Sequence, residues 1–193
     1  MIAVPKLAPT PEASWSDERL VSECLKGKQE AWDALIEKYK NLIYSIPVKL
    51  GLHDDAADVF QAVCLDLLKQ LKNIREPRAL AKWIMQAAYH RCLRVKVQDS
   101  REAPPHDDGV EVPSAQALPD ALLLQLEREQ AVRGAVAALS PRCRDMVQLL
   151  FYQDTPRPYA EVAAQLGLAT GSVGFIRGRC LSALKKQLQK AGF

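Results

Sequence analysis

The amino-acid sequence predicts an all-α protein: two small helical domains joined by a flexible acidic linker, with a helix-turn-helix in the second domain. Apolar residues recur at helical spacing along most of the 193 residues, and no convincing alternating strand pattern occurs. Four prolines, a glycine and scattered acids interrupt this pattern over residues 98–119, a stretch too long for an ordinary loop in a compact domain. We therefore predict a lead-in at 1–15, a first domain at 16–97 and a second at 120–193.

The lead-in contains three prolines and no apolar run, which is typical of a disordered segment rather than of a secretory signal. No segment of the chain reaches the roughly 18 uninterrupted apolar residues that a membrane span needs. We therefore expect no membrane span and a place in the cytoplasm.

Local signals divide the first domain into four predicted helices. Ser16 is a suitable N-cap for the first helix, and Gly27 is a plausible end. The apolar positions of the second helix begin at Trp32, and Pro47 should kink or end it. The third helix begins near residue 54 or 55, and the fourth begins at Pro77, where proline suits a first turn.

The second domain shows a similar series of helix signals. A helical stretch over 122–139 is followed by Ser140 and Pro141, a cap with a proline in the first turn. This next helix should end near Tyr152. A short helix over 158–166, a turn and a last helix over 170–190 complete the prediction.

The five cysteines favour neither a disulfide framework nor a zinc site. Their number is odd, their spacing is wide and no CxxC occurs. Each lies within an apolar helical pattern, so we interpret all five as small buried hydrophobic residues.

The net charge of +3 conceals two strongly basic zones, one in each domain. Residues 75–101 hold seven bases against two acids, and the last helix with its tail holds five bases and no acid. The stretch between them, 102–130, carries a net charge of −6. A basic helix binds phosphate through direct pairing and counterion release. Either zone alone could be an ordinary solvated face, but two zones together favour a nucleic-acid partner.

Residues 159–173 have the spacing of a helix-turn-helix. Val162 and Leu166 face inward on a short helix, and Ala163 is small where a second helix must cross closely. Gly167 makes the turn and Val173 anchors the second helix, which would then face the major groove. An incidental helical hairpin is the alternative.

The last helix contains the predicted DNA-reading residues. Arginine can pair bidentately with guanine, whereas lysine more often neutralises phosphate. Gly174 and Gly178 each weaken a helix by roughly 1 kcal/mol relative to alanine. Close approach of the backbone to a phosphate and weak base reading both remain open as explanations. The candidates for DNA contact are Ser172, Arg177, Arg179 and Lys185.

Five motifs together resemble a known family. They are DAADVFQ at 55–61, WIMQAA at 83–88, LSPRCR at 139–144, YAEVA at 159–163 and GSVGFIRGRCL at 171–181. The pattern is similar to bacterial RNA polymerase sigma factors of the extracytoplasmic-function type, and it covers nearly the whole chain beyond the lead-in. The sequence departs from that family in having Ala62 where an acid is usual, and in two extra residues around 156–158.

The resemblance implies a protein that binds core RNA polymerase and directs promoter recognition, DNA melting and transcription initiation. Asp55, Asp58 and Gln61 would bind the polymerase clamp, and the last helix would read the minus-thirty-five element of promoter DNA. The acidic linker would extend toward the polymerase cleft. Whether an anti-sigma factor also binds the protein is left open. Melting captures an unstacked base, which suits a basic surface with planar side chains. The residues implied at the minus-ten element are Arg78, Lys82, Tyr89, His90, Arg91 and Arg94.

No catalytic or cofactor motif competes with this interpretation. None of the three histidines lies in HExxH, and neither a phosphate-binding glycine loop nor a nucleophile elbow occurs. We therefore expect no enzyme activity, cofactor or metal site, and we interpret Asp54 and Asp55 beside His53 as helix-capping acids. Two alternatives remain: a dimeric helix-turn-helix regulator that is not a polymerase subunit, and a protein-interaction module such as an inhibitory partner of a sigma factor.

Overall fold

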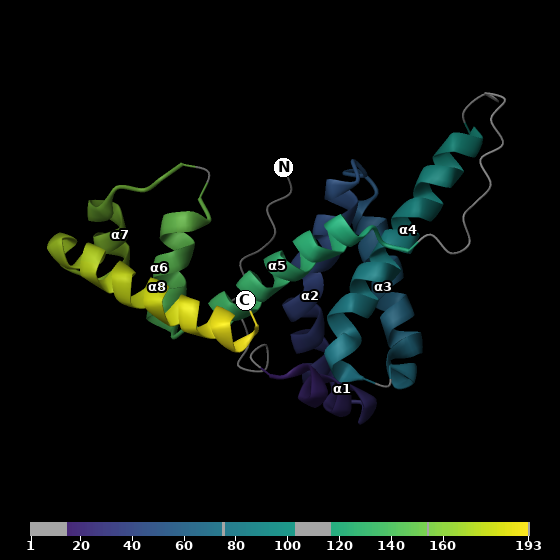
Figure 1. Cartoon of the computed structure of the whole chain (residues 1–193), viewed down its shortest axis with the longest axis horizontal. Helices are drawn as coiled ribbons and strands as arrows, with labels where there is room; N and C mark the ends of the chain where they lie inside the picture. Colours follow the sequence, from purple (N-terminus) through teal and green to yellow (C-terminus); the bar gives the residue numbers. More distant parts are fainter. Residues whose placement is uncertain (1–14, 75, 103–116, 154, 193) are drawn as a thin grey trace. The chain divides into compact units, whose positions relative to one another are not determined.

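The computed structural model describes residues 15–74, 76–102, 117–153 and 155–192. Within these residues all regular structure is helical, with eight α-helices and no strand, so the predicted all-α class is confirmed (Figure 1). The chain divides into two compact units, Met1–Glu127 and Arg128–Phe193. The lead-in through residue 14, Arg75 and the linker interior at 103–116 lie outside the described residues.

The first unit is a helical bundle in which α2, α3 and α4 pack against one another and α1 packs on α2 (Figure 1). Its core contains large side chains that are almost completely buried, among them Tyr39, Leu42, Ile84 and Leu67. Burial of each such apolar side chain stabilises the fold by about 1.5–3 kcal/mol. The helices are α1 (Asp17–Leu25), α2 (Gln29–Lys49), α3 (Ala56–Gln70) and α4 (Leu80–Glu102), with short 3-10 turns at Leu71–Asn73 and Pro77–Ala79.

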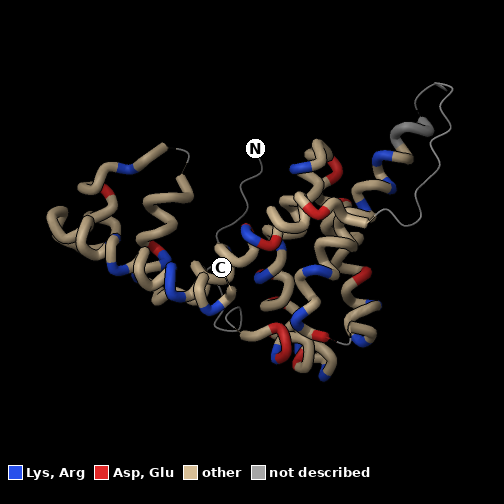
Figure 2. Tube along the Cα trace, viewed as in Figure 1, with Lys and Arg blue, Asp and Glu red and all other residues tan. Residues whose placement is uncertain are grey.

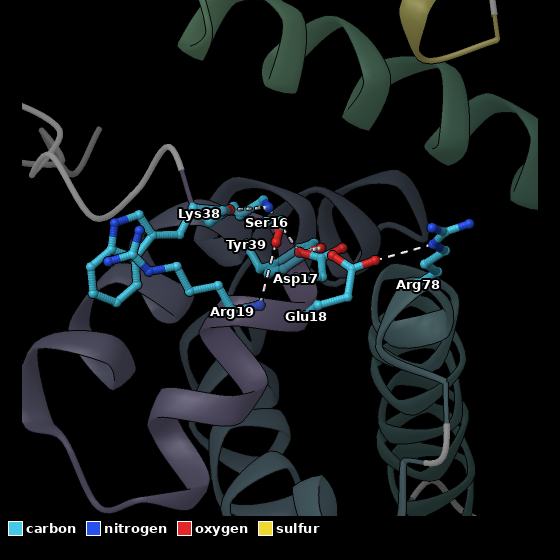
Figure 3. Close-up of polar contacts among 8 residues, drawn as sticks. Ser16, Asp17, Glu18, Arg19, Lys38, Tyr39 and Arg78 are labelled. Carbon is cyan, nitrogen blue, oxygen red and sulfur yellow. Dashed lines mark hydrogen bonds and ion pairs between the residues drawn. The ribbon is translucent and has the colours of Figure 1, made fainter.

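The start of α1 is fixed by polar contacts with α2 (Figure 3). The Ser16 hydroxyl accepts a hydrogen bond from the Arg19 backbone N–H at 3.3 Å, which confirms the predicted N-cap. The Asp17 carboxylate accepts hydrogen bonds from the Tyr39 hydroxyl and from the Lys38 ammonium group, each at 2.8 Å. Burial and the negative charge of Asp17 both raise the pKa of Tyr39, so the phenol stays protonated and donates.

Two helices continue beyond their predicted ends. Pro47 lies inside α2, which runs on to Lys49, because the backbone N–H of Leu50 bonds to the carbonyls of Ile46 and Pro47 and completes the turn after the proline. Of the two predicted effects of Pro47, a kink or an end, the structure excludes the end. The helix α4 continues to Glu102, five residues into the predicted linker. No proline or glycine interrupts the chain before Pro104, so nothing stops the helix at residue 97.

The helix α5 (Asp120–Ala137) contributes to both units. Leu126 is fully buried in the core of the first unit, and Leu122 and Leu123 pack against that core. Val136 belongs to a small cluster in the second unit. The division between the units consequently falls inside this helix, whereas the second domain was predicted to begin at residue 120.

The second unit packs α6 against α7 and α8 (Figure 1). Ser140 and Pro141 stand where predicted, at the N-cap and in the first turn of α6. The helices of this unit are α6 (Pro141–Phe151), α7 (Tyr159–Leu166) and α8 (Val173–Lys190), with a 3-10 turn at Thr170–Ser172 before α8. The buried residues between them are Met146, Val162, Ala163, Val173 and Cys180.

A disulfide joins Cys143 on α6 to Cys180 on α8, with 5.1 Å between the Cα atoms. This corrects the prediction that all five cysteines are unpaired hydrophobic residues. The two cysteines are 37 residues apart, and only the packing of α6 on α8 brings them together. Cys24 and Cys92 are free and buried as predicted, and Cys64 is free and half-buried.

None of the helices in the described part of the chain is long and apolar enough to cross a membrane. The same residues contain no cluster of three or more His, Cys, Asp or Glu side chains that could hold a metal ion.

Candidate nucleic-acid interface

The turn between α7 and α8 is set by a glycine and one backbone hydrogen bond. Gly167 has a φ of +62°, in the left-handed region that glycine adopts without steric cost. The backbone N–H of Leu168 then donates to the carbonyl of Ala163 at 2.8 Å and closes the end of α7. Leu168 also packs against the core of the unit, so the chain enters α8 at a fixed angle.

The helix α8 buries one face and exposes a basic one. Val173 and Cys180 are 0% and 1% exposed, and Ile176 packs beside them. No acidic residue occurs on α8, and Figure 2 shows its basic positions spaced along the helix. These positions are Arg177, Arg179, Lys185, Lys186 and Lys190, all of them exposed.

The four predicted DNA-reading residues of the second unit differ in exposure and in their contacts. Arg179 and Lys185 are exposed along α8, and Ser172 is half-buried in the turn that precedes it. Arg177 is exposed, but its guanidinium donates a hydrogen bond to the Tyr159 hydroxyl on α7 and lies 5.8 Å from the centre of the Tyr159 ring. The orientation of Arg177 is therefore set by α7.

Phe175 is an exposed aromatic residue that the sequence reading overlooked. Its side chain is 71% exposed, and the Arg179 guanidinium lies 6.0 Å from the centre of its ring. It lies five positions before the buried Cys180, which at 100° per residue is close to the opposite side of the helix. That spacing could have placed Phe175 on the outer face before the structure was known.

The glycines on either side of Phe175 are not required by packing within the described protein. A Cβ atom added to Gly174 or Gly178 would meet no heavy atom within 4 Å. With Phe175 and Arg179 they line a shallow open depression on the outer face of α8.

The Leu139–Arg144 motif is a structural connection between α5 and α6. The Arg144 guanidinium donates to the backbone carbonyls of Ala137 and Leu139, at 2.6 and 3.1 Å. Carbonyls at the end of a helix lack partners within the helix. The arginine supplies hydrogen bonds to two of them and so fixes the connection between α5 and α6.

Four of the six residues predicted at the minus-ten element are exposed on the first unit. Lys82, His90 and Arg94 lie on exposed positions of α4. Arg78 lies in the 3-10 turn before α4, where its guanidinium pairs with the Glu18 carboxylate at 3.1 Å (Figure 3). Its side chain is 88% exposed, so this pair leaves most of the guanidinium accessible.

The other two residues, Tyr89 and Arg91, make their contacts within the first unit. Tyr89 is only 6% exposed, because it lies four positions after Met85 and three before Cys92 on the inward face of α4. The Arg91 guanidinium pairs with the Asp66 carboxylate on α3 through two hydrogen bonds, the one from Nε measuring 2.7 Å. This hydrogen-bonded pairing raises the pKa of Arg91 above its ordinary value. Trp83, also on α4, packs half-buried against the core.

The predicted polymerase-binding residues lie on α3. Asp55 is half-buried at the N-cap, and Asp58 and Gln61 are exposed. Leu65 and Leu68 continue the line of these residues at intervals of three or four and are 55% and 61% exposed. The exposed face of α3 is therefore polar at its beginning and apolar toward its end, and the sequence reading missed the two leucines.

Comparison with known proteins confirms the resemblance inferred from the motifs. The chain is 25% identical over 183 residues to the ECF RNA polymerase sigma-E factor of Escherichia coli K12, an alignment that covers 90% of this chain and 95% of the relative. The ECF RNA polymerase sigma-E factor of Salmonella typhimurium LT2 aligns with the same identity and coverage. No protein-family model matches the chain. The protein is thus a distant homologue of ECF sigma-E factors along nearly its whole length.

Proposed function

We propose that this chain is a sigma factor that binds core RNA polymerase in the cytoplasm and directs promoter recognition, DNA melting and transcription initiation, while catalysing nothing itself. The homology to ECF sigma-E factors carries the proposal, because it covers 90% of the chain and spans both units rather than one DNA-binding motif. Exposed basic residues on α4 in the first unit and on α8 in the second support a DNA partner.

In this proposal α7 and α8 form a helix-turn-helix whose second helix reads the duplex minus-thirty-five element. The left-handed Gly167 and the buried Val173 hold α8 with its basic face outward, as such a motif requires. Arg179 and Lys185 are open for contact with bases or phosphates. Arg177, held by Tyr159, and Ser172, in the turn, would contact the DNA from the start of the helix.

The first unit would bind the minus-ten element and the polymerase. Lys82, His90 and Arg94 on α4, with Arg78 just before it, would meet the melted strand. Arg91 would support this surface through Asp66 and Tyr89 through the core, rather than by direct contact. On α3, the exposed Asp58 and Gln61 beside the N-cap Asp55 would bind the clamp of core RNA polymerase.

Transcription reconstituted from purified components tests the proposal. The full chain and bacterial core RNA polymerase should co-elute and should together give run-off transcripts from a subset of a promoter library. Arg179→Ala should reduce this transcription without changing binding to core, and if the arginine contacts phosphate it should lower the salt slope of DNA binding by about one. Failure to bind core would overturn the proposal, and tight dimeric binding to palindromic DNA without core would favour a conventional regulator.

A further inference from the structure

We propose that Phe175 selects a thymine by contacting its C5-methyl group in the major groove. The inference rests on the proposed function of α8 as a promoter-reading helix and names a specificity residue within that surface. It concerns a side chain that offers no hydrogen bond and no charge, and that therefore cannot act as a phosphate contact.

The first support is the position of Phe175. At 71% it is the most exposed large hydrophobic residue of the described chain. The buried face of α8, marked by Val173 and Cys180, lies on the other side of the helix. Leaving so much apolar surface in water is unfavourable, and contact with an apolar group of a ligand would recover that loss.

The second support is the bare backbone beside it. Gly174 and Gly178 destabilise a helix relative to alanine, and a Cβ built at either position would meet no described atom within 4 Å beyond its two chain neighbours and the local helix backbone. Internal packing in the described protein thus offers no reason for glycine there. An outside surface that approaches the helix closely would find its room at these two positions, which lie one turn apart on the same flank of Phe175.

The third support is the chemistry of the surroundings, which matches DNA better than an apolar protein partner. The depression around Phe175 includes Arg179 and Lys186, and α8 has no acidic residue. These cations suit phosphates and the acceptor atoms of guanine. Among the base edges exposed in the major groove, the thymine methyl is the apolar group that a phenylalanine can contact.

Replacing thymine by uracil tests the inference, because the exchange removes only the methyl group. Holoenzyme made from the full chain and core RNA polymerase would first select its sites from a library randomised over the upstream promoter element. Each thymine of the selected element would then be replaced by uracil, one at a time, and the affinity measured. At one thymine the wild-type protein should lose about fourfold in affinity, which corresponds to the roughly 0.8 kcal/mol of one buried methylene-sized group.

Phe175→Ala should weaken binding to the thymine site and should abolish the difference between thymine and uracil at that position. Phe151→Ala is the matched control, because Phe151 is also an exposed phenylalanine of the second unit, at the end of α6 and 56% exposed. That variant should keep the fourfold difference.

Three results would overturn the inference while leaving the proposed function intact. The wild-type holoenzyme could select a site that is insensitive to uracil at every thymine, or Phe175→Ala could keep the discrimination. Phe175→Ala could also impair binding to core polymerase or to another protein with no change in base preference, which would assign the ring to a protein interface. A holoenzyme that selects no sequence at all would instead refute the proposed function together with this inference.

Discussion

The two units of this protein hold their helices together by different means. The first unit buries many large side chains among α2, α3 and α4 and adds polar contacts around Asp17. The second unit buries a few residues between α6, α7 and α8 and joins two of these helices through Cys143 and Cys180. Small cores supply little stability by themselves, and covalent links are a common remedy. The comparison indicates that the second unit depends on its disulfide more than the first depends on any one contact.

The largest expected effect is loss of the disulfide. Cys143→Ser, or reduction of the wild-type protein by a dithiol, should destabilise the second unit by roughly 4 kcal/mol, because the bond closes a loop of 37 residues. Hydrogen exchange followed residue by residue should then show faster exchange in α6 and α8 and unchanged exchange in α2. The control is Cys64→Ser, which alters a free thiol of the first unit. Equal protection of α8 with and without reductant would remove the contrast between the units.

The state of the cysteines can be counted directly. Alkylation of the chain, unfolded without reductant, should label the three free cysteines and leave Cys143 and Cys180 unmodified until they are reduced. In the folded protein, burial raises the pKa of both Cys24 and Cys92 to about 11, so both stay as unreactive thiols at pH 8. Mass spectrometry of the labelled peptides measures both outcomes, and five labelled cysteines without reductant would refute the disulfide.

In the first unit, Tyr39→Phe should cost about 1.5–3 kcal/mol of unfolding free energy. The hydroxyl donates to the charged Asp17 carboxylate, and hydrogen bonds to charged groups are worth about that much. Chemical denaturation measured by circular dichroism checks the value. Because the ring stays buried, a loss above 4 kcal/mol would mean that the core had repacked, and no loss would mean that Lys38 alone satisfies Asp17.

The N-cap of α1 should contribute less. Ser16→Ala should destabilise the first unit by about 1 kcal/mol, because the Arg19 backbone N–H loses its acceptor. Ser16→Asp, which can accept the same bond, should restore most of this loss in the same denaturation experiment. Equal stability of all three proteins would show that the cap contributes nothing.

The smallest expected effect on stability is that of Arg78. Its pair with Glu18 is strongly exposed, and such pairs contribute little to stability. Arg78→Ala should therefore leave the unfolding transition unchanged, so that a loss of transcription in this variant reports on DNA contact. A marked drop in stability would disqualify this variant as a probe of function.

The features that the sequence predicted well are local ones. Ser16 and Gly167 act within a few residues of themselves, so a cap and a left-handed turn can be read directly from the chain. The apolar spacing of Val162 and Val173 likewise predicted which faces are buried. These signals were enough for the helical class and for the order of the helices.

Most of the features that were missed depend on packing between helices. The pairing of Cys143 with Cys180 and of Arg91 with Asp66 requires knowledge of which helices are neighbours. Tyr89 lies one residue from the exposed His90, and only the packing of α4 decides which of the two faces inward. Phe175 was not among the predicted DNA contacts, because those were side chains that can hydrogen-bond to bases or pair with phosphate, although its position on the helix was already determined by the spacing.

The disulfide between α6 and α8 also closes the chain from residue 143 to residue 180 into a covalent ring. The helix α7 is part of that ring. A protease that cuts one peptide bond within this ring cannot separate the pieces, since the sulfur atoms still join them. On a denaturing gel the nicked protein would run as two fragments only after a reducing agent is added.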